Sequence, residues 1–429
     1  MSAAATTIIF DDKAKKKPRL LPPPHTYERL YSSYQFEWEQ RKKSFPPHVE
    51  INDLAYCSDH GVLLGCTSLG QIAIWVLPNE SDRTDPSTEK SSFETKPSVQ
   101  VQISTKPLYS IQLHKTSTDA FVAGEDGLFH LTSFIELLSS SEAADKAAQH
   151  VWKDTSIRKI QIYQNHIYLL DDQRNTVHRL QISTWQTMYS YSLDDCHQED
   201  ENDKERDMTM TTIQIVPTTS NSEQSPSACL LVGTNRSKVL VWDLKDHKAL
   251  EAVDLVQATT SKNNNMSKQQ ETRFSVASIA VSANSYWWTI AGRTTTTTTA
   301  NNRHRRNDRD SESTDAGGFC STWHGPTRSL LTMAETNESI QDIALSLSQH
   351  LYSVANQAMV RVWESSHRLD NKDTAGIWTS PPSGKSIVTF LYQEQKQRQN
   401  HEELVAMAGV GPKVDVLKQH CLLYSLELK

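Results

Sequence analysis

The sequence predicts an all-β protein made of repeated four-stranded units, because one short hairpin pattern recurs along the chain. Its clearest copies are "LGCTSLGQIAIW", "LVGTNRSKVLVW" and "YSVANQAMVRVW", which end at Trp75, Trp242 and Trp363. Apolar and polar residues alternate before each tryptophan, as in a strand with one buried face. A second apolar segment precedes each of these strands and is joined to it by small or polar residues, which indicates a hairpin. A hairpin that recurs in this way is typical of a WD-repeat β-propeller.

Four strands can be assigned in each of seven successive units, so we expect a seven-bladed WD-repeat β-propeller over residues 46–429. A weaker copy of the hairpin ends at Trp323, and the second, third and seventh units contain it without the tryptophan. The last unit contains its own final strand in "CLLYSLEL", so we expect that strand to complete the last blade. A short N-terminal helix precedes the propeller in this prediction.

Residues 1–25 are predicted to be a disordered basic leader. The run "KAKKKPR" is followed closely by three prolines, which cannot continue a helix. A compact cationic run in a flexible arm fits a nuclear-import signal. The alternative is an ordinary solvated basic tail. The residues of this candidate signal are Lys13, Lys15, Lys16, Lys17 and Arg19.

Residues 26–45 are predicted to contain the N-terminal helix. Large apolar residues recur there at three- and four-residue spacing and make one stripe. Pro46 and Pro47 end the helix. Two uses fit the stripe equally well: it covers the propeller's own surface, or it binds a groove on a partner. The stripe consists of Tyr27, Leu30, Tyr31, Tyr34 and Trp38.

Polar inserts interrupt the repeats, and three of them are predicted to be disordered loops, at about 194–207, 259–271 and 293–316. The first is acidic, "DDCHQEDENDKERD", and the last contains six consecutive threonines followed by an arginine-rich run. Such segments bury too little apolar area to order themselves. Loops also lengthen at a small entropic cost, whereas a strand inside a blade does not.

Composition excludes several classes of function. The formal net charge of −7 does not favour a broad nucleic-acid-coating surface, and no signal peptide or membrane span is recognisable. The six cysteines are scattered without a C-x-x-C pair, so neither a zinc site nor any other cofactor is expected. We therefore expect an intracellular protein with reduced cysteines.

No catalytic constellation is recognisable, and we expect a protein that is not an enzyme. The segment "PPSGKS" (Pro381–Ser386) ends like a phosphate-binding loop, but it lacks the first glycine of that motif and precedes a strand, so a turn is expected. The fixed place of Trp75, Trp242, Trp323 and Trp363 in their hairpins indicates packing between blades rather than a base-stacking platform.

Several segments together resemble the WD-repeat subunits of the THO complex, the subunit 6 family. The resemblance covers roughly residues 26–429 and lies in the order of the motifs. The matching segments are "GQIAI" (Gly70–Ile74), "KPLYSI" (Lys106–Ile111), "AGEDG" (Ala123–Gly127), "VLVWDL" (Val239–Leu244) and "KVDV" (Lys413–Val416). The basic leader, the acidic insert and the threonine- and arginine-rich insert depart from that family.

The resemblance implies a non-catalytic scaffold in the nucleus. Such a subunit packs against coiled-coil THO subunits in an assembly that couples transcription and processing to mRNA export. It implies indirect or weak RNA contact, and no membrane or small-molecule substrate. The alternative is a WD-repeat substrate receptor of a cullin–RING ubiquitin ligase. The signature of those receptors is W-D-x-R, and here Lys245 replaces the arginine of the motif that begins at Trp242, so the planar guanidinium fork is lost.

Overall fold

A computed structural model describes most of the chain from residue 49 onward. The predicted leader 1–25, with its basic run, the predicted helix 26–45, with its apolar stripe, and the insert 194–207 lie outside the described residues. The described ranges are 49–77, 97–114, 118–138, 148–193, 208–217, 228–250, 252–256, 270–298, 315–336, 339–345, 351–355, 359–363, 374–378, 384–393, 401–409, 413–418 and 421–427.

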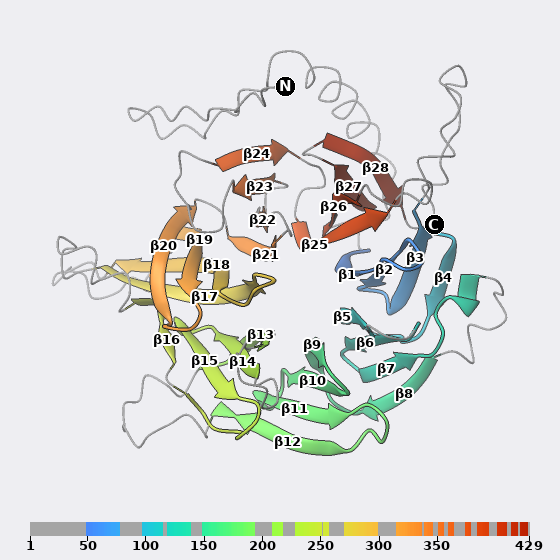
Figure 1. Cartoon of the computed structure of the whole chain (residues 1–429), viewed down its shortest axis with the longest axis horizontal. Coiled ribbons are helices and arrows are strands. Elements are labelled where there is room, and N and C mark those ends of the chain that lie inside the picture. The colour runs from blue at the N-terminus through green and yellow to red at the C-terminus, as the bar shows by residue number, and fades with distance from the viewer. Residues whose placement is uncertain are drawn as a thin grey trace, which may run out of the picture.

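The described residues form an all-β fold of seven four-stranded antiparallel sheets (Figure 1). Each sheet contains four strands that follow one another in the chain. A 3-10 turn, η2 (Glu136–Leu138), lies between the third and fourth strands of the second sheet. The strands are β1 (Ile51–Cys57), β2 (Val62–Thr67), β3 (Gln71–Val76), β4 (Val99–Gln102), β5 (Leu108–Leu113), β6 (Ala120–Gly124), β7 (Gly127–Leu131), β8 (Ala148–Lys153), β9 (Ile157–Tyr163), β10 (His166–Asp171), β11 (Thr176–Gln181), β12 (Thr187–Ser192), β13 (Met210–Pro217), β14 (Ala228–Thr234), β15 (Lys238–Asp243), β16 (Val253–Asp254), β17 (Gln270–Val281), β18 (Trp287–Thr298), β19 (Asp315–His324), β20 (Ser329–Thr336), β21 (Ile340–Leu345), β22 (Leu351–Ala355), β23 (Met359–Trp363), β24 (Thr374–Trp378), β25 (Gly384–Gln393), β26 (His401–Gly409), β27 (Lys413–Lys418) and β28 (Cys421–Glu427).

The sheets are arranged around a common centre, with the first strand of each sheet innermost (Figure 1). Each innermost strand contacts the innermost strand of the next sheet, and β25 of the last sheet contacts β1 of the first. The final strand β28 pairs with β27, so the last sheet is completed by its own C-terminal strand as expected. This architecture is compatible with a β-propeller.

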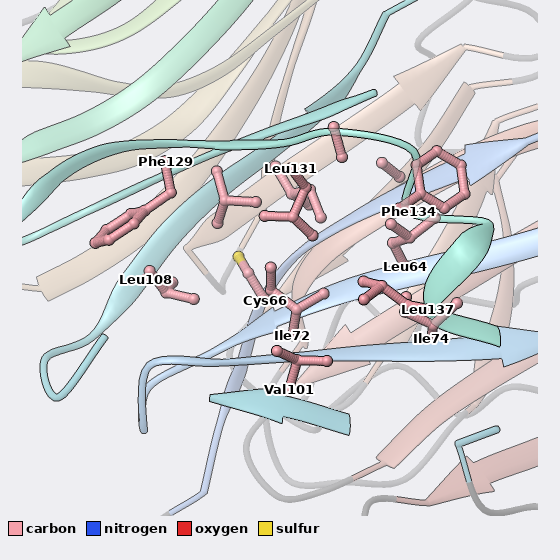
Figure 2. Close-up of a cluster of buried hydrophobic side chains, with 14 of the residues drawn as sticks. Leu64, Cys66, Ile72, Ile74, Val101, Leu108, Phe129, Leu131, Phe134 and Leu137 are labelled. Atoms are coloured by element: carbon pink, nitrogen blue, oxygen red, sulfur yellow. The ribbon is translucent and has the colours of Figure 1, made fainter. Parts of the chain in front are cut away.

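The core lies between neighbouring sheets. Figure 2 shows one apolar cluster, in which Leu64 and Ile74 of the first sheet pack with Phe129 and Leu131 of the second. Alternate residues along each strand supply these side chains, which is why the apolar and polar residues alternate in the sequence. Another cluster joins the first sheet to the last, since it contains residues of β1, β2 and β3 together with residues of β26 and β27.

The predicted insert 293–316 is shorter in the structure. Strand β18 continues through Thr298 and β19 already begins at Asp315, so disorder is the wrong prediction for both ends of this insert. The end of the insert 259–271 is likewise wrong, because Gln270 begins β17 and pairs with Thr298. The threonines need no apolar burial to be ordered. They are β-branched, and the backbone of Thr294–Thr296 is paired on both sides, with β17 and with β19, while Thr297 and Thr298 pair with β17.

Candidate functional site at the inner strands

Every innermost strand carries a register irregularity, in the middle of β17 and near the beginning of the other six, and the residue that follows it is polar in all seven sheets. In β1 the shift lies between Ile51 and Asp53, and in β21 it lies between Ile340 and Asp342. A β-bulge of this kind re-aims the side chain beside it. We call these seven residues the polar ring. They are Asp53, Ser110, Lys159, Thr212, Ser278, Asp342 and Ser386.

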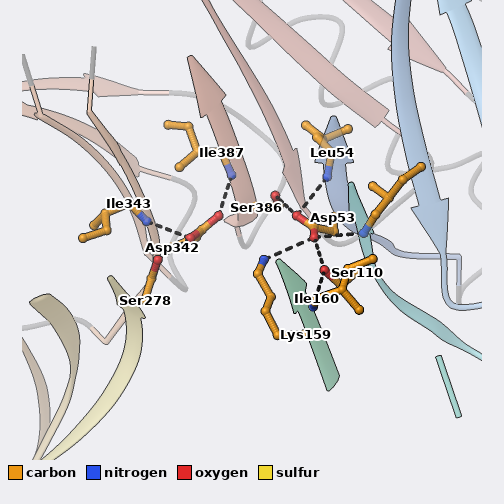
Figure 3. A network of polar contacts seen from close by, with 11 residues as sticks. Asp53, Leu54, Ser110, Lys159, Ile160, Ser278, Asp342, Ile343, Ser386 and Ile387 are labelled. Carbon is orange, nitrogen blue, oxygen red and sulfur yellow. Dashed lines mark hydrogen bonds and ion pairs between the residues drawn. The ribbon is translucent and has the colours of Figure 1, made fainter. Parts of the chain in front are cut away.

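Asp53 links four sheets through its carboxylate (Figure 3). One oxygen, Oδ2, accepts hydrogen bonds from Ser110 Oγ at 2.8 Å and from Lys159 Nζ at 3.2 Å. The other oxygen, Oδ1, accepts from Ser386 Oγ of the last sheet at 3.1 Å. Two backbone N–H groups, of Leu54 at 3.1 Å and of Ile111 at 3.2 Å, also donate to it. With this many donors the buried carboxylate is well satisfied.

Asp342 of the sixth sheet repeats the same arrangement, two sheets from Asp53 around the ring (Figure 3). Its Oδ1 accepts from Ser278 Oγ of the preceding sheet at 2.6 Å and from the N–H of Ile343 at 2.9 Å. Its Oδ2 accepts from the N–H of Ile387 in the following sheet at 3.0 Å. Each aspartate therefore bonds to its own strand, to a serine one sheet back and to a backbone N–H one sheet ahead.

A third contact follows the same rule, since the N–H of Ile160 donates to Ser110 Oγ of the preceding sheet at 3.4 Å. The innermost strand has a hydrogen-bonded neighbour on one side only, so half of its backbone groups face away from the ladder. In these three sheets the polar ring gives one of those N–H groups a partner. From the fifth sheet through the seventh and first to the third, the ring thus supplies hydrogen bonds between inner strands.

Lys159 and Asp342 of the ring affect each other's pKa. Burial alone would lower the pKa of Lys159, but the carboxylates of Asp53 and Asp342 outweigh this effect, so the pKa of the ammonium group is raised. Burial also raises the pKa of Asp342, although Lys159 and the bonds from Ser278 and Ile387 act in the opposite direction. The side chain of Asp53 is 6 % exposed and that of Lys159 is 26 % exposed, so this ion pair is only partly shielded from solvent.

The segment Pro381–Ser386 does not end as a turn at its last residues. Strand β25 begins at Gly384, so Lys385 and Ser386 belong to an innermost strand. Lys385 forms an ion pair with Glu50, and Ser386 bonds to Asp53. Both side chains therefore join the last sheet to the first, and neither acts as part of a phosphate-binding loop.

Three of the four signature tryptophans have described side chains, and all three are buried between sheets. Trp75 packs in a cluster with residues of the last sheet. Trp242 lies edge-on to Tyr191 of the preceding sheet, with ring centroids 6.0 Å apart. Trp323 lies in a cluster with Leu231 of the preceding sheet. Trp363 ends β23, but its side chain lies outside the described residues.

Among the described residues, Asp171, His178 and Ser190 bring together the residue types of a nucleophilic triad. The Nδ1 atom of His178 lies 2.9 Å from Ser190 Oγ, and its Nε2 atom lies 3.6 Å from Asp171 Oδ2. In a nucleophilic triad the serine is bonded to Nε2 and the acid to Nδ1, so the order is reversed here. The Oδ1 atom of Asp171 instead accepts the N–H groups of Gln173 and Arg174 and holds a turn. This geometry favours a structural role.

The polar ring is the feature that sequence reasoning missed. The sequence signal exists in the first strand of each unit: an apolar residue or glycine, any residue, a polar residue and then leucine or isoleucine, as in "INDL", "LYSI", "IRKI", "IQDI" and "GKSI". Alignment of the seven first strands, rather than of the tryptophan hairpins, would have found it. The spacing alone does not show which serine faces which aspartate.

We expect Asp53→Asn to destabilise the protein by about 3 kcal/mol, because it leaves the Lys159 ammonium without its partner and turns one accepting oxygen into a donor. Urea unfolding followed by tryptophan fluorescence measures the change. The matched control is Arg158→Met, which breaks an ion pair with Asp172 whose two side chains are 47 % and 36 % exposed and should move the midpoint little. Equal effects of the two substitutions would contradict the role of the ring.

Asp342→Asn should change how stability depends on pH. The folded protein holds the Asp342 proton more tightly than the unfolded chain, because the pKa of this group is raised from 3.8. The folded state then binds more protons above pH 3.8, so this group lowers stability as pH rises until its folded pKa is passed. The unfolding free energy of wild type minus that of Asp342→Asn should therefore fall with rising pH and then level off. Urea titrations at successive pH values test this, and a difference that rises with pH would refute it.

Among the described residues, no group of three or more histidine, cysteine, aspartate or glutamate side chains could hold a metal ion. No helix in the described part of the chain is long and apolar enough to span a membrane. No protein-family model matches the chain, and no curated protein matches its sequence.

Proposed function

We propose that the seven sheets are the blades of a closed WD-repeat β-propeller. Two repeated features support this proposal. The innermost strands contact one another in cyclic order, including β25 with β1. The polar ring also recurs at the same position of every innermost strand, which is what a sevenfold repeat of one unit requires.

We further propose that this propeller is a non-catalytic scaffold of a THO-like assembly that couples transcription and processing to mRNA export. The observation that carries the proposal is the use of the central polar groups. Asp53 and Asp342 are bonded to neighbouring inner strands, so the side chains at the centre hold the fold together. A rigid disk whose polar centre serves packing suits a binding role. The choice of a THO-like assembly rests on the ordered motifs that resemble THO subunits.

The apolar stripe of residues 26–45 is the proposed contact with coiled-coil THO subunits. We expect Tyr31→Ser/Tyr34→Ser to reduce recovery of these subunits when the tagged full-length protein is purified from cells and its partners are identified by mass spectrometry. The matched control is Arg29→Ala/Gln40→Ala, which changes the opposite face of the same predicted helix and should leave recovery unchanged.

Recovery of a cullin adaptor without THO subunits would reject the scaffold proposal in favour of the ubiquitin-ligase alternative. That alternative depends on the motif from Trp242 to Lys245. In the structure Trp242 is buried, whereas Lys245 is exposed and its N–H donates to Asp243 Oδ1 at 2.7 Å. Lys245→Ala should abolish recovery of the adaptor if the alternative holds.

The basic run is the proposed nuclear-import signal. Deletion of residues 13–19 should shift a fluorescent fusion of the full-length chain from the nucleus to the cytoplasm, because the import receptor loses its cationic contact. Deletion of residues 2–7, which removes uncharged residues from the same segment, serves as the control. Unchanged nuclear accumulation after deletion of 13–19 would show that another part of the chain carries the signal.

A further inference from the structure

Arg179 is a cation at the junction of the third and fourth sheets, and within the described part of the chain no carboxylate pairs with it. It lies in β11, and its Nη1–H group donates to the backbone oxygen of Leu244, which follows β15, at 3.5 Å. Its Nε–H group is buried and has no hydrogen-bond partner among the described residues. A guanidinium group in this state is unfavourable, because it has lost water without gaining an acceptor.

The imidazole ring of His166, the first residue of β10, lies against the same guanidinium group. Arg179 Nη2 is 3.2 Å from Nε2 and 3.4 Å from Nδ1 of this ring. A nitrogen nearly equidistant from both ring nitrogens lies over the face of the imidazole and not along a lone pair. Arginine stacks on aromatic faces in this way. The edge formed by Nε–H and Nη2–H, which can bind an oxyanion with two parallel hydrogen bonds, therefore lacks an in-plane acceptor in the described structure.

His247 and Tyr191 lie on the other side of Arg179. His247 belongs to the turn between β15 and β16, and its Nδ1 atom is 2.9 Å from the hydroxyl oxygen of Tyr191 in β12. The ring of Tyr189 stacks on His247, with centroids 4.1 Å apart. Burial raises the pKa of Tyr191 and lowers that of His247, and the charge of Arg179 acts to lower the pKa of both. Side chains of two sheets therefore gather around one arginine.

Both histidines favour their neutral form in this environment. Burial, followed by the charge of Arg179, lowers the pKa of His166 and that of His247. The carboxylates of Asp243 and Asp246 oppose this effect at His247 without reversing it. Asp243 is engaged in its own turn, where Oδ1 accepts two backbone N–H groups. The group thus contains one permanent positive charge and two imidazoles that gain a charge when an anion is present.

We propose that His166, Arg179, Tyr191 and His247, which we call the arginine cluster, bind a phosphoryl group. The three basic side chains are partly exposed, so a ligand reaches them from solvent. Rotation of the His166 ring frees the Nε–H and Nη2–H edge of Arg179 for two oxygens of the anion. The protonated histidines donate to the remaining oxygens. Donors on several sides suit a tetrahedral dianion better than a planar carboxylate. This site is independent of the scaffold role proposed above.

Calorimetric titration of the full-length protein with inorganic phosphate at constant ionic strength tests the proposal. We expect saturable binding with a Kd below about 1 mM, and acetate should bind at least about tenfold more weakly. N-acetyl-O-phosphoserine amide distinguishes the two sources of a phosphoryl group. Tighter binding of this compound than of inorganic phosphate assigns the site to a phosphorylated side chain of a partner, and weaker binding assigns it to free phosphate.

Sulfate tests the role of the histidines, because its double negative charge does not change in the working pH range. A bound dianion favours the protonated forms of His166 and His247, so sulfate should bind about tenfold more tightly at about pH 5.5 than at about pH 8. His247→Phe retains a ring to stack on Tyr189 but removes both nitrogens, and should reduce this pH dependence. Sulfate affinity that does not change with pH in the wild type would contradict the proposed site.

Arg179→Lys retains the positive charge but loses the fork, and should weaken phosphate binding at least about tenfold. The matched control is Arg158→Lys in the same sheet, since Arg158 is 47 % exposed and already pairs with Asp172. It should bind phosphate as the wild type does. Equal binding by Arg179→Lys and wild type overturns the proposal. Absence of saturable phosphate binding by the wild type also overturns it, whether or not the Arg179 variant folds.

Discussion

The innermost strand of each sheet has a neighbour on one side only, and its other backbone groups need partners of a different kind. The polar ring meets this need. In three sheets the N–H that follows the ring position, that of Ile111, Ile160 or Ile387, donates to a side chain of the preceding sheet. The same side chains tie neighbouring sheets together where the apolar clusters begin. An unsatisfied edge at the centre would be costly.

The ring also explains how the two ends of the repeat array meet. The first and last sheets come from opposite ends of the described chain and share no strand. They are joined by the bond from Ser386 to Asp53, by the ion pair between Lys385 and Glu50, and by the apolar cluster around Trp75. These contacts join the last sheet to the first through side chains.

Much of the strand pattern could be predicted from the sequence, because alternation of apolar residues reports burial directly. The hairpins at Trp75 and Trp242 and the final strand at Cys421 are examples. The extent of β18 could not be predicted, since composition marks Thr294–Thr298 as polar while the order there comes from backbone pairing, with β17 throughout and also with β19 as far as Thr296. The polar ring was not predicted for a related reason. The role of a single serine or aspartate in a strand can be interpreted only when the strands that face it are known.

Native-state hydrogen exchange of three amides tests the central claim most directly. The N–H groups of Ile111, Ile160 and Ile387 lie on strands with one neighbour, yet each donates to a side chain of the ring. We predict that all three exchange nearly as slowly as amides of the central strands, and that Asp53→Asn selectively accelerates Ile111. Fast exchange of these amides in the wild-type protein, as at an open edge, would contradict the account.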